Sequence, residues 1–388
     1  MKLNKNVIVF TGGGTAGHIF PGIAVADELK SLNNNFDIYW IGCSKGMDKS
    51  IVEKSMEVKD SKESTIKKFY GIPSGKLRRY FSIKNFFDLF NIFFGFVKSF
   101  FLLLRLKPVA LFSKGGFVSV PPCLAAKILG IPVYIHECDF TLGLANRINV
   151  KSAKTIFVSY EETKNKLSEV NQSKTIVTGN PVRPIFNSAN KENGLSTLGI
   201  KNQVEGENKL ILLVLGGSLG AKQINNLIYE NIEWLCERFI VIHQTGLVNN
   251  SDDNEKSLTE KYKDSYKPFP FIHKDIQDVI SCADVVVSRA GANSIWETAV
   301  LNKPMVLIPL CGSGTRGDQV DNANYFASKD CAKVLVGENA NSETLKESLT
   351  YMIENENRNK MKNAIKKLVE GEVPAKKIAK IINENIEK

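Results

Sequence analysis

The sequence has no cysteine pattern of the kind that builds a disulfide framework or a zinc site. Its 388 residues include seven cysteines, an odd number, and none of them forms a C-x-x-C pair. Such a set is typical of a reduced, cytosolic protein, so we expect neither disulfides nor a bound metal. The first apolar run, residues 7–10, is also too short for the hydrophobic segment of a signal peptide, and it fits a first core strand.

A long uncharged apolar run is missing from the segment that is richest in aromatic residues. Residues 80–106 contain ten aromatic side chains, but their longest uncharged stretch is residues 89–97. A spanning helix needs about 20 mostly uncharged residues, so we expect the segment not to cross a membrane. With Lys76, Arg78 and Arg79 just before it, the segment is typical of a surface that docks on anionic lipid. The alternative, a pair of amphipathic helices packed on the first sheet, stays open.

The overall charge narrows the choice of partners only slightly. Lys and Arg number 51 against 41 Asp and Glu, which gives a formal net charge of +10. A basic excess can favour nucleic acid, an anionic membrane surface or a phosphate-bearing substrate. No aromatic-basic motif lies on an expected sheet face, so we do not expect a nucleic-acid partner.

The two halves of the chain begin alike, with an apolar strand, a glycine-rich turn and a helix. The first half runs from residues 7–10 into a helical pattern at 23–32, and the second repeats this from 210–215. Alternating strands and helices predict an α/β fold with parallel sheets, and the length predicts two domains. The expected parts are an N-terminal Rossmann-like domain (1–186, joined by a C-terminal helix at 371–388), a polar linker (187–208) and a C-terminal Rossmann-like domain (209–370).

The first glycine-rich turn lacks the acid that a dinucleotide site requires. Gly12, Gly14 and Gly17 fit G-x-G-x-x-G, but the second strand ends in residues 41–44, Ile-Gly-Cys-Ser, where an acid should hold the ribose. The pattern therefore disfavours a dehydrogenase. Glycines and helix N-termini still suit a diphosphate, unless they serve only as tight turns.

Two further turns and five side chains complete the candidate site. GGSLGA, with the hydroxyl of Ser218, and SKGG at 113–116 also follow strands. His18 lies where the first turn enters its helix, and an unperturbed pKa of about 6.5 suits a general base, although a capping or packing role is the alternative. Glu297 can accept ribose hydroxyls or be a solvated helix residue. Asp318 and Gln319 can read sugar hydroxyls, and Arg183 can reach a phosphate.

Taken together, these motifs resemble the MurG family of glycosyltransferases. The matching segments follow the family's order over almost the whole chain. They are GGGTAGHIFPGIAVADEL (Gly12–Leu29), KGGFVSVPP (Lys114–Pro122), GIPVYIHE (Gly130–Glu137), GNPVR (Gly179–Arg183), GGSLGA, SRAGANSIWE (Ser288–Glu297) and the loop ending in Gly317-Asp318-Gln319. The resemblance implies the glycosyltransferase B architecture, in which two Rossmann-like domains have parallel sheets facing a cleft.

The resemblance also implies the position of each substrate. The C-terminal domain should hold UDP-N-acetylglucosamine, and the N-terminal domain should hold a lipid acceptor at the membrane. The implied contacts are Ile272 with the uracil through its backbone, Glu297 with the ribose, Ser218 and Arg183 near the diphosphate, and Gln319 with the sugar. Further implied contacts are Thr15, Ala16 and Gly17 from the first domain, and Ala292, Asn293, Ser294, Ile295 and Trp296 along the nucleotide.

The implied reaction is a single inverting displacement. The 4-hydroxyl of a lipid-linked muramoyl-pentapeptide attacks the anomeric carbon and UDP leaves. No metal or other cofactor is expected, because helix dipoles and backbone N–H groups can stabilise the leaving diphosphate. The expected location is the cytoplasmic face of the cell membrane, on an anionic surface. A related transferase for another membrane lipid and an inactive membrane-docked scaffold are the alternatives.

Three positions depart from the family's pattern. Ala16 stands where many members have Gly, and Leu219 stands where many have Gln. Asp139 stands where many have Asn. An Asp there can still hydrogen-bond the substrate, and it also offers an alternative base to His18. We favour His18, because a free carboxylate with a pKa of about 4 is a weak base.

Overall fold

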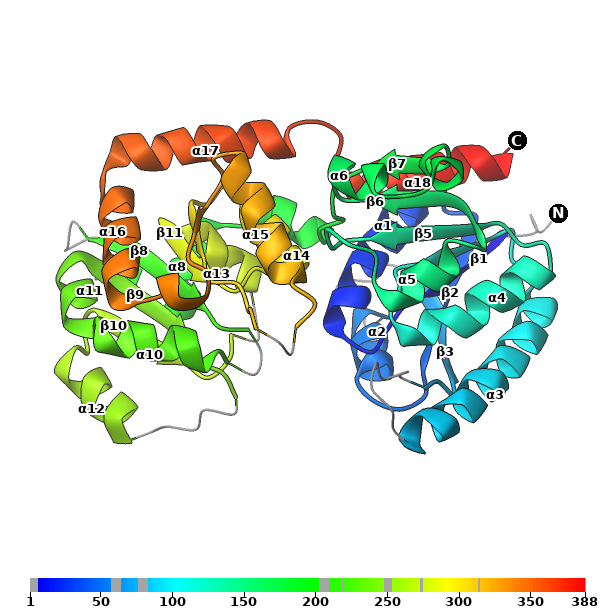
Figure 1. Cartoon of the computed structure of the whole chain (residues 1–388), viewed down its shortest axis with the longest axis horizontal. Helices are drawn as coiled ribbons and strands as arrows, with labels where there is room; N and C mark the ends of the chain where they lie inside the picture. Colours follow the sequence, from blue (N-terminus) through cyan, green and yellow to red (C-terminus); the bar gives the residue numbers. More distant parts are fainter. Residues whose placement is uncertain are drawn as a thin grey trace. The chain divides into compact units, whose positions relative to one another are not determined.

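The computed structural model describes residues 6–56, 64–75, 83–201, 209–217, 220–247, 253–272, 275–312 and 315–387, with the backbone alone at 83–87 and 253–255. The chain divides into two compact units (Figure 1). The N-terminal unit contains Met1–Pro184 and Glu372–Lys388, and the C-terminal unit contains Ile185–Gly371.

The N-terminal unit is built on a seven-stranded sheet in the order β3-β2-β1-β4-β5-β6-β7. Every neighbouring pair of these strands is parallel. The strands are β1 (Asn6–Thr11), β2 (Phe36–Cys43), β3 (Ile66–Ile72), β4 (Ala110–Ser113), β5 (Val133–Glu137), β6 (Ala153–Val158) and β7 (Thr175–Val177). The central strands are almost continuously apolar, as expected where helices cover both faces of a parallel sheet.

Helices cover this sheet in two layers, each with its own apolar cluster. One cluster joins the sheet to α1 (Phe20–Leu32) and α18 (Pro374–Glu387), so the C-terminal helix packs on the N-terminal unit. Ile378 and Ile382 of α18 are fully buried there, and each such side chain contributes roughly 1.5–3 kcal/mol. The other helices of this unit are α2 (Asp48–Met56), α3 (Ile83–Leu106), α4 (Val120–Ile128), α5 (Leu144–Asn149), α6 (Glu161–Asn165) and α7 (Glu169–Gln172), with short 3₁₀ turns η1 (Ala16–His18) and η2 (Phe117–Ser119).

The C-terminal unit repeats the plan with six parallel strands in the order β10-β9-β8-β11-β12-β13. The strands are β8 (Leu210–Leu215), β9 (Phe239–Gln244), β10 (Tyr266–Phe269), β11 (Val285–Ser288), β12 (Met305–Leu307) and β13 (Lys333–Val334). The helices are α8 (Lys191–Leu198), α10 (Lys222–Glu230), α11 (Ile232–Arg238), α12 (Asp253–Lys261), α13 (Ile276–Cys282), α14 (Ala292–Val300), α15 (Asp318–Ser328), α16 (Ser342–Ile353) and α17 (Asn355–Val369), with η3 (Pro184–Ser188) and η4 (Gly337–Asn339). The prediction of an α/β fold with two parallel-sheet units is confirmed.

The segment predicted as a linker differs from that expectation. Residues 187–208 include α8, which packs against α13 within the C-terminal unit. Asn190 caps α8 and its backbone N–H donates to Asp278 at 2.8 Å. Leu195 and Leu198 are buried and Gly194 approaches the α13 backbone closely, so a mostly polar composition conceals a short helix with one buried face.

The aromatic segment forms one helix, α3, instead of a pair. Figure 1 shows α3 beside α4, and the two helices pack against each other. By length and composition alone, Asp88–Leu106 qualifies as a membrane-crossing helix, with a mean hydropathy of 1.7 and 17% of the window buried. The sequence indicates no crossing, because Lys98 and Arg105 interrupt the apolar stretch. The basic residues at 76, 78 and 79 lie outside the described residues.

Candidate functional site

The turn after β1 carries the first group of candidate residues. Gly14 has a φ of 83°, in the left-handed region that favours glycine, and it redirects the chain into η1. The Trp40 indole donates to the Gly12 carbonyl at 3.1 Å, while the Gly14 N–H donates to the buried carboxylate of Asp48 at 2.8 Å. The turn is therefore anchored from two sides before any ligand binds.

His18 is oriented by its neighbour Thr15. The Thr15 hydroxyl and His18 Nδ1 are 2.9 Å apart, and the His18 backbone N–H donates to the Thr15 carbonyl at 3.1 Å. In the tautomer that protonates Nδ1, that nitrogen donates to Thr15 and Nε2 carries the lone pair that a general base needs. Ala16 and Gly17 lie on the same short turn, and the Arg183 guanidinium stacks 4.5 Å over the ring of Phe20, the first residue of α1. The structure thus places Arg183 beside the turn.

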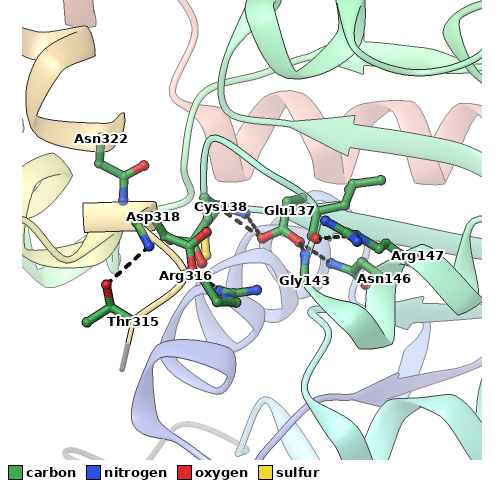
Figure 2. Close-up of polar contacts among 12 residues, drawn as sticks. Glu137, Cys138, Gly143, Asn146, Arg147, Thr315, Arg316, Asp318 and Asn322 are labelled. Atoms are coloured by element: carbon green, nitrogen blue, oxygen red, sulfur yellow. Dashed lines mark hydrogen bonds and ion pairs between the residues drawn. The ribbon is translucent and has the colours of Figure 1, made fainter. Parts of the chain in front are cut away.

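Glu137 at the end of β5 organises the loop that carries Asp139. Its carboxylate is buried, and Oε1 accepts the backbone N–H groups of Cys138 and Asp139 at 3.0 and 3.1 Å. Oε2 accepts the Gly143 N–H at 2.9 Å and the Asn146 amide at 3.0 Å (Figure 2). Sequence reasoning used Glu137 only as part of a motif. The signal that points to it is an acid at the carboxyl end of a buried parallel strand.

The neighbours of Glu137 do not have the chemistry of a metal site. Glu137, Cys138 and Asp139 have ligand atoms within 4.8 Å of one another. However, four donors already occupy the Glu137 carboxylate, and burial raises the pKa of the Cys138 thiol to about 12. His136 is also unsuited to proton transfer near neutral pH, because burial, followed by the charge of Lys114, holds its pKa well below the ordinary value. Asp139 is half-buried and remains on the loop as the alternative base.

In the C-terminal unit, Gln244 at the end of β9 links two parts of the expected nucleotide site. Its amide nitrogen donates to the Gly217 carbonyl at 3.1 Å, and its Oε1 accepts the Ile272 N–H at 3.1 Å. The Ile272 N–H is thus bonded within the protein, which leaves the backbone carbonyl of Ile272 to contact a nucleobase. Ser218 and Leu219 lie outside the described residues. Gln244 was not among the predicted residues, and its position on a strand end is the signal that could have indicated it.

Only some of the α14 residues that were predicted to line the nucleotide have side chains that are accessible. Ile295 is fully buried, and Trp296 packs edge-on against Phe326 with ring centroids 5.7 Å apart. Ser294 is exposed, and Asn293 and Glu297 are half-buried. Ala292 begins the helix and is buried. The side chains of Asn293, Ser294 and Glu297 can therefore reach a ligand, while the other positions shape the backbone.

The loop after β12 is tied to the helix that follows it. Gln319 Oε1 accepts the Leu310 N–H at 3.0 Å, which leaves the amide nitrogen to donate elsewhere. Arg316 and Asp318 form an ion pair across the start of α15 (Figure 2). Arg289, which sequence reasoning did not single out, donates to the Gln223 side chain and the Ile308 carbonyl, both at 2.9 Å. It thereby joins the ends of β11 and β12 to α10.

The chain matches two family models over most of its length. Residues 8–158 match the glycosyltransferase family 28 N-terminal domain, and residues 211–382 match the glycosyltransferase family 28 C-terminal domain.

Similar proteins include two from the genus Treponema. The Treponema denticola protein named UDP-N-acetylglucosamine–N-acetylmuramyl-(pentapeptide) pyrophosphoryl-undecaprenol N-acetylglucosamine transferase is 53% identical, over 85% of this chain and 84% of its own. The Treponema pallidum protein of the same name is 44% identical, over 89% and 86%. The crystal structure of Acinetobacter baumannii MurG matches the fold with a TM-score of 0.72 at 23% identity, covering 98% of this chain and 99% of that one. The chain therefore belongs to glycosyltransferase family 28 and, within it, to the MurG family that its motifs indicate.

Proposed function

We propose that this protein transfers N-acetylglucosamine from UDP-N-acetylglucosamine to the muramoyl 4-hydroxyl of undecaprenyl-diphospho-muramoyl-pentapeptide, with inversion at the anomeric carbon. The observation that carries the proposal is the 53% identity, over 85% of the chain, to a protein that bears this name. The anchored turn with its paired Thr15 and His18 supports it, since a transfer to a hydroxyl needs a group that accepts the proton.

The donor is assigned to the C-terminal unit. Glu297 is half-buried on α14, and its carboxylate can accept hydrogen bonds from both ribose hydroxyls. The free amide nitrogen of Gln319 is assigned to the sugar, and the Ile272 carbonyl to the uracil. Negative charge that develops on the leaving diphosphate is stabilised by backbone N–H groups and by the positive N-termini of α10 and α14, so the proposal requires no metal.

The acceptor is assigned to the N-terminal unit, with His18 as the base. As the 4-hydroxyl attacks, its oxygen forms the new bond to the anomeric carbon and the bond to UDP breaks. His18 Nε2 takes the hydroxyl proton, while Nδ1–H donates to Thr15, which stabilises the imidazolium that forms. Asp139 is the alternative acceptor of this proton.

We expect the lipid acceptor to reach the protein at the membrane, to which the protein binds through a surface on α3. One side of this helix is buried at Gly95, Ser99 and Leu103. Large apolar side chains on the helix remain exposed: Leu89, Phe90, Phe93, Phe94, Phe101 and Leu104. Such a surface is rare on a soluble monomer and fits shallow insertion between lipid head groups, which supports a peripheral enzyme at the cytoplasmic face.

The proposal is tested by UDP release from UDP-N-acetylglucosamine in the presence and absence of the lipid-linked muramoyl acceptor. We expect release that depends on this acceptor, together with a disaccharide product on the lipid. Release with a different membrane lipid alone would assign the related acceptor specificity instead. No UDP release with any acceptor would refute the proposed enzymatic activity and would favour the alternative of an inactive membrane-docked scaffold. His18→Ala should lower kcat roughly 10²- to 10⁴-fold, the usual contribution of a positioned base.

A further inference from the structure

A buried carboxylate from another element holds the turn that carries Thr15 and His18. Asp48 is the first residue of α2 and is 1% exposed. Its Oδ1 accepts the Gly14 N–H and its Oδ2 accepts the Cys43 N–H, both at 2.8 Å. One side chain therefore ties the turn after β1 to the end of β2, the strand end where a dinucleotide site would place its ribose-binding acid.

The turn is shaped to admit this carboxylate. A Cβ atom on Gly13 would lie 1.8 Å from Asp48 Oδ2, so only glycine leaves room for it. Burial raises the pKa of Asp48 because it penalises the charged form, while the two backbone hydrogen bonds oppose that shift. A charge that is costly to bury is thus retained next to a glycine that makes space for it.

The arrangement changes what the turn can offer a ligand. In phosphate-binding turns the backbone N–H groups point at the anion. Here the Gly14 N–H already donates to Asp48, and a phosphate at that position would meet a carboxylate of the same charge. The turn is therefore better suited to setting the positions of Thr15 and His18 than to binding a diphosphate through Gly14.

We propose that Asp48 is a positioning residue for His18, holding the turn in the arrangement that presents the imidazole to the acceptor hydroxyl. A shift of the Gly14 backbone is passed to His18 through Thr15, because the side chain and the carbonyl of Thr15 both form hydrogen bonds with His18. The inference rests on the proposed function, because it takes His18 as the base.

The first test is Asp48→Asn. The Gly14 and Cys43 N–H groups bond to different oxygens of Asp48, so in the amide one of them faces an NH₂ group instead of an acceptor. We expect kcat to fall roughly 10- to 100-fold, the loss expected for a misplacement of about 1 Å, while KM for UDP-N-acetylglucosamine changes less than about twofold. Glu53→Gln, at an exposed carboxylate on the same helix, is the matched control and should retain full activity. An unchanged kcat in a folded Asp48→Asn protein would overturn the proposal.

A double-mutant cycle with His18→Ala separates positioning from general stabilisation. If Asp48 acts through His18, Asp48→Asn should cost less than about twofold in the His18→Ala background. An equal loss in both backgrounds would overturn the proposal, as would a fully active His18→Ala enzyme. If thermal unfolding shows that Asp48→Asn does not fold, Gly13→Ala displaces the same carboxylate and replaces it in the cycle. Wild-type protein without acceptor-dependent UDP release would instead refute the proposed function, before any variant is compared.

Discussion

Replacing the Glu137 carboxylate by an amide should loosen one side of the loop between β5 and α5. Glu137→Gln keeps the size of the side chain but turns one of the two acceptor oxygens into an NH₂ group. If that group faces Cys138 and Asp139, two buried N–H donors lose their acceptor. If it faces the other side, only Gly143 loses its acceptor, because Asn146 can turn its own amide and offer an oxygen.

The second arrangement keeps the Cys138 and Asp139 N–H groups bonded and sets the expected magnitude. The Gly143 N–H loses its partner, and Asn146 gives up its 3.0 Å bond to the His136 carbonyl. An unsatisfied buried polar group costs about 1–3 kcal/mol, so the two together should cost about 2–6 kcal/mol. At 1.4 kcal/mol per tenfold change, the Gly143 amide should exchange its hydrogen at least about 30-fold faster, whereas Cys138 and Asp139 keep their protection.

Amide hydrogen exchange across residues 138–143, read by mass spectrometry after proteolysis or by NMR, measures this difference directly. Glu161→Gln is the matched control, since Glu161 is an exposed acid on α6 of the same unit. Exchange rates that change less than about threefold at Cys138, Asp139 and Gly143 alike would refute the assignment of Glu137 as the anchor of the loop. Faster exchange at Cys138 and Asp139 with Gly143 unchanged would show that the NH₂ group faces those two amides instead.

Three further outcomes follow from other parts of the molecule. Glu297→Gln should raise KM for UDP-N-acetylglucosamine roughly tenfold or more, because hydrogen bonds to a charged group contribute about 1.5–3 kcal/mol. Initial-rate kinetics measure this, with Glu343→Gln as the control, and an unchanged KM in Glu297→Gln would contradict it. Phe93→Glu on α3 should reduce the fraction of protein that sediments with vesicles of anionic lipid at least about tenfold. An equal loss of vesicle binding with Ile128→Glu, at an exposed apolar residue on α4, would argue against a specific membrane-binding surface on α3. Burial lowers the pKa of His243 to about 3, so the unfolded chain takes up a proton below its ordinary pKa of about 6.5 while the folded chain does not. Stability should therefore fall as pH drops from about 6.5 towards 3, by about 2 kcal/mol at pH 5, and a pH-independent urea midpoint in this window would contradict the buried neutral state.

The sequence predicted the repeated units because their signals are local. Each sheet has short, almost continuously apolar strands that end in glycines and are followed by a helix, and this pattern needs no knowledge of distant residues. The helix α8 was not predicted, because the signal for it is not local. Gly194 interrupts a mostly polar segment, and the two leucines that it brings against α13 do not stand out in the sequence. Its existence depends on packing against a neighbour 80 or so residues away, which periodicity cannot register.

The residues that sequence reasoning missed share one task. In the proposed reaction we expect no substrate contact from any of the four, Asp48, Glu137, Gln244 and Arg289. The side chain of each forms a hydrogen bond with the backbone of a turn or of a strand end. Asp48 reaches Gly14, 34 positions earlier, and Gln244 reaches Gly217, 27 positions earlier. A glycine turn exposes backbone groups that a buried site must satisfy, and loops are weakly held unless something accepts those bonds. Each turn that a motif identifies therefore requires an anchoring polar side chain elsewhere in the chain. In an α/β fold the carboxyl ends of neighbouring strands are the first place to search for it.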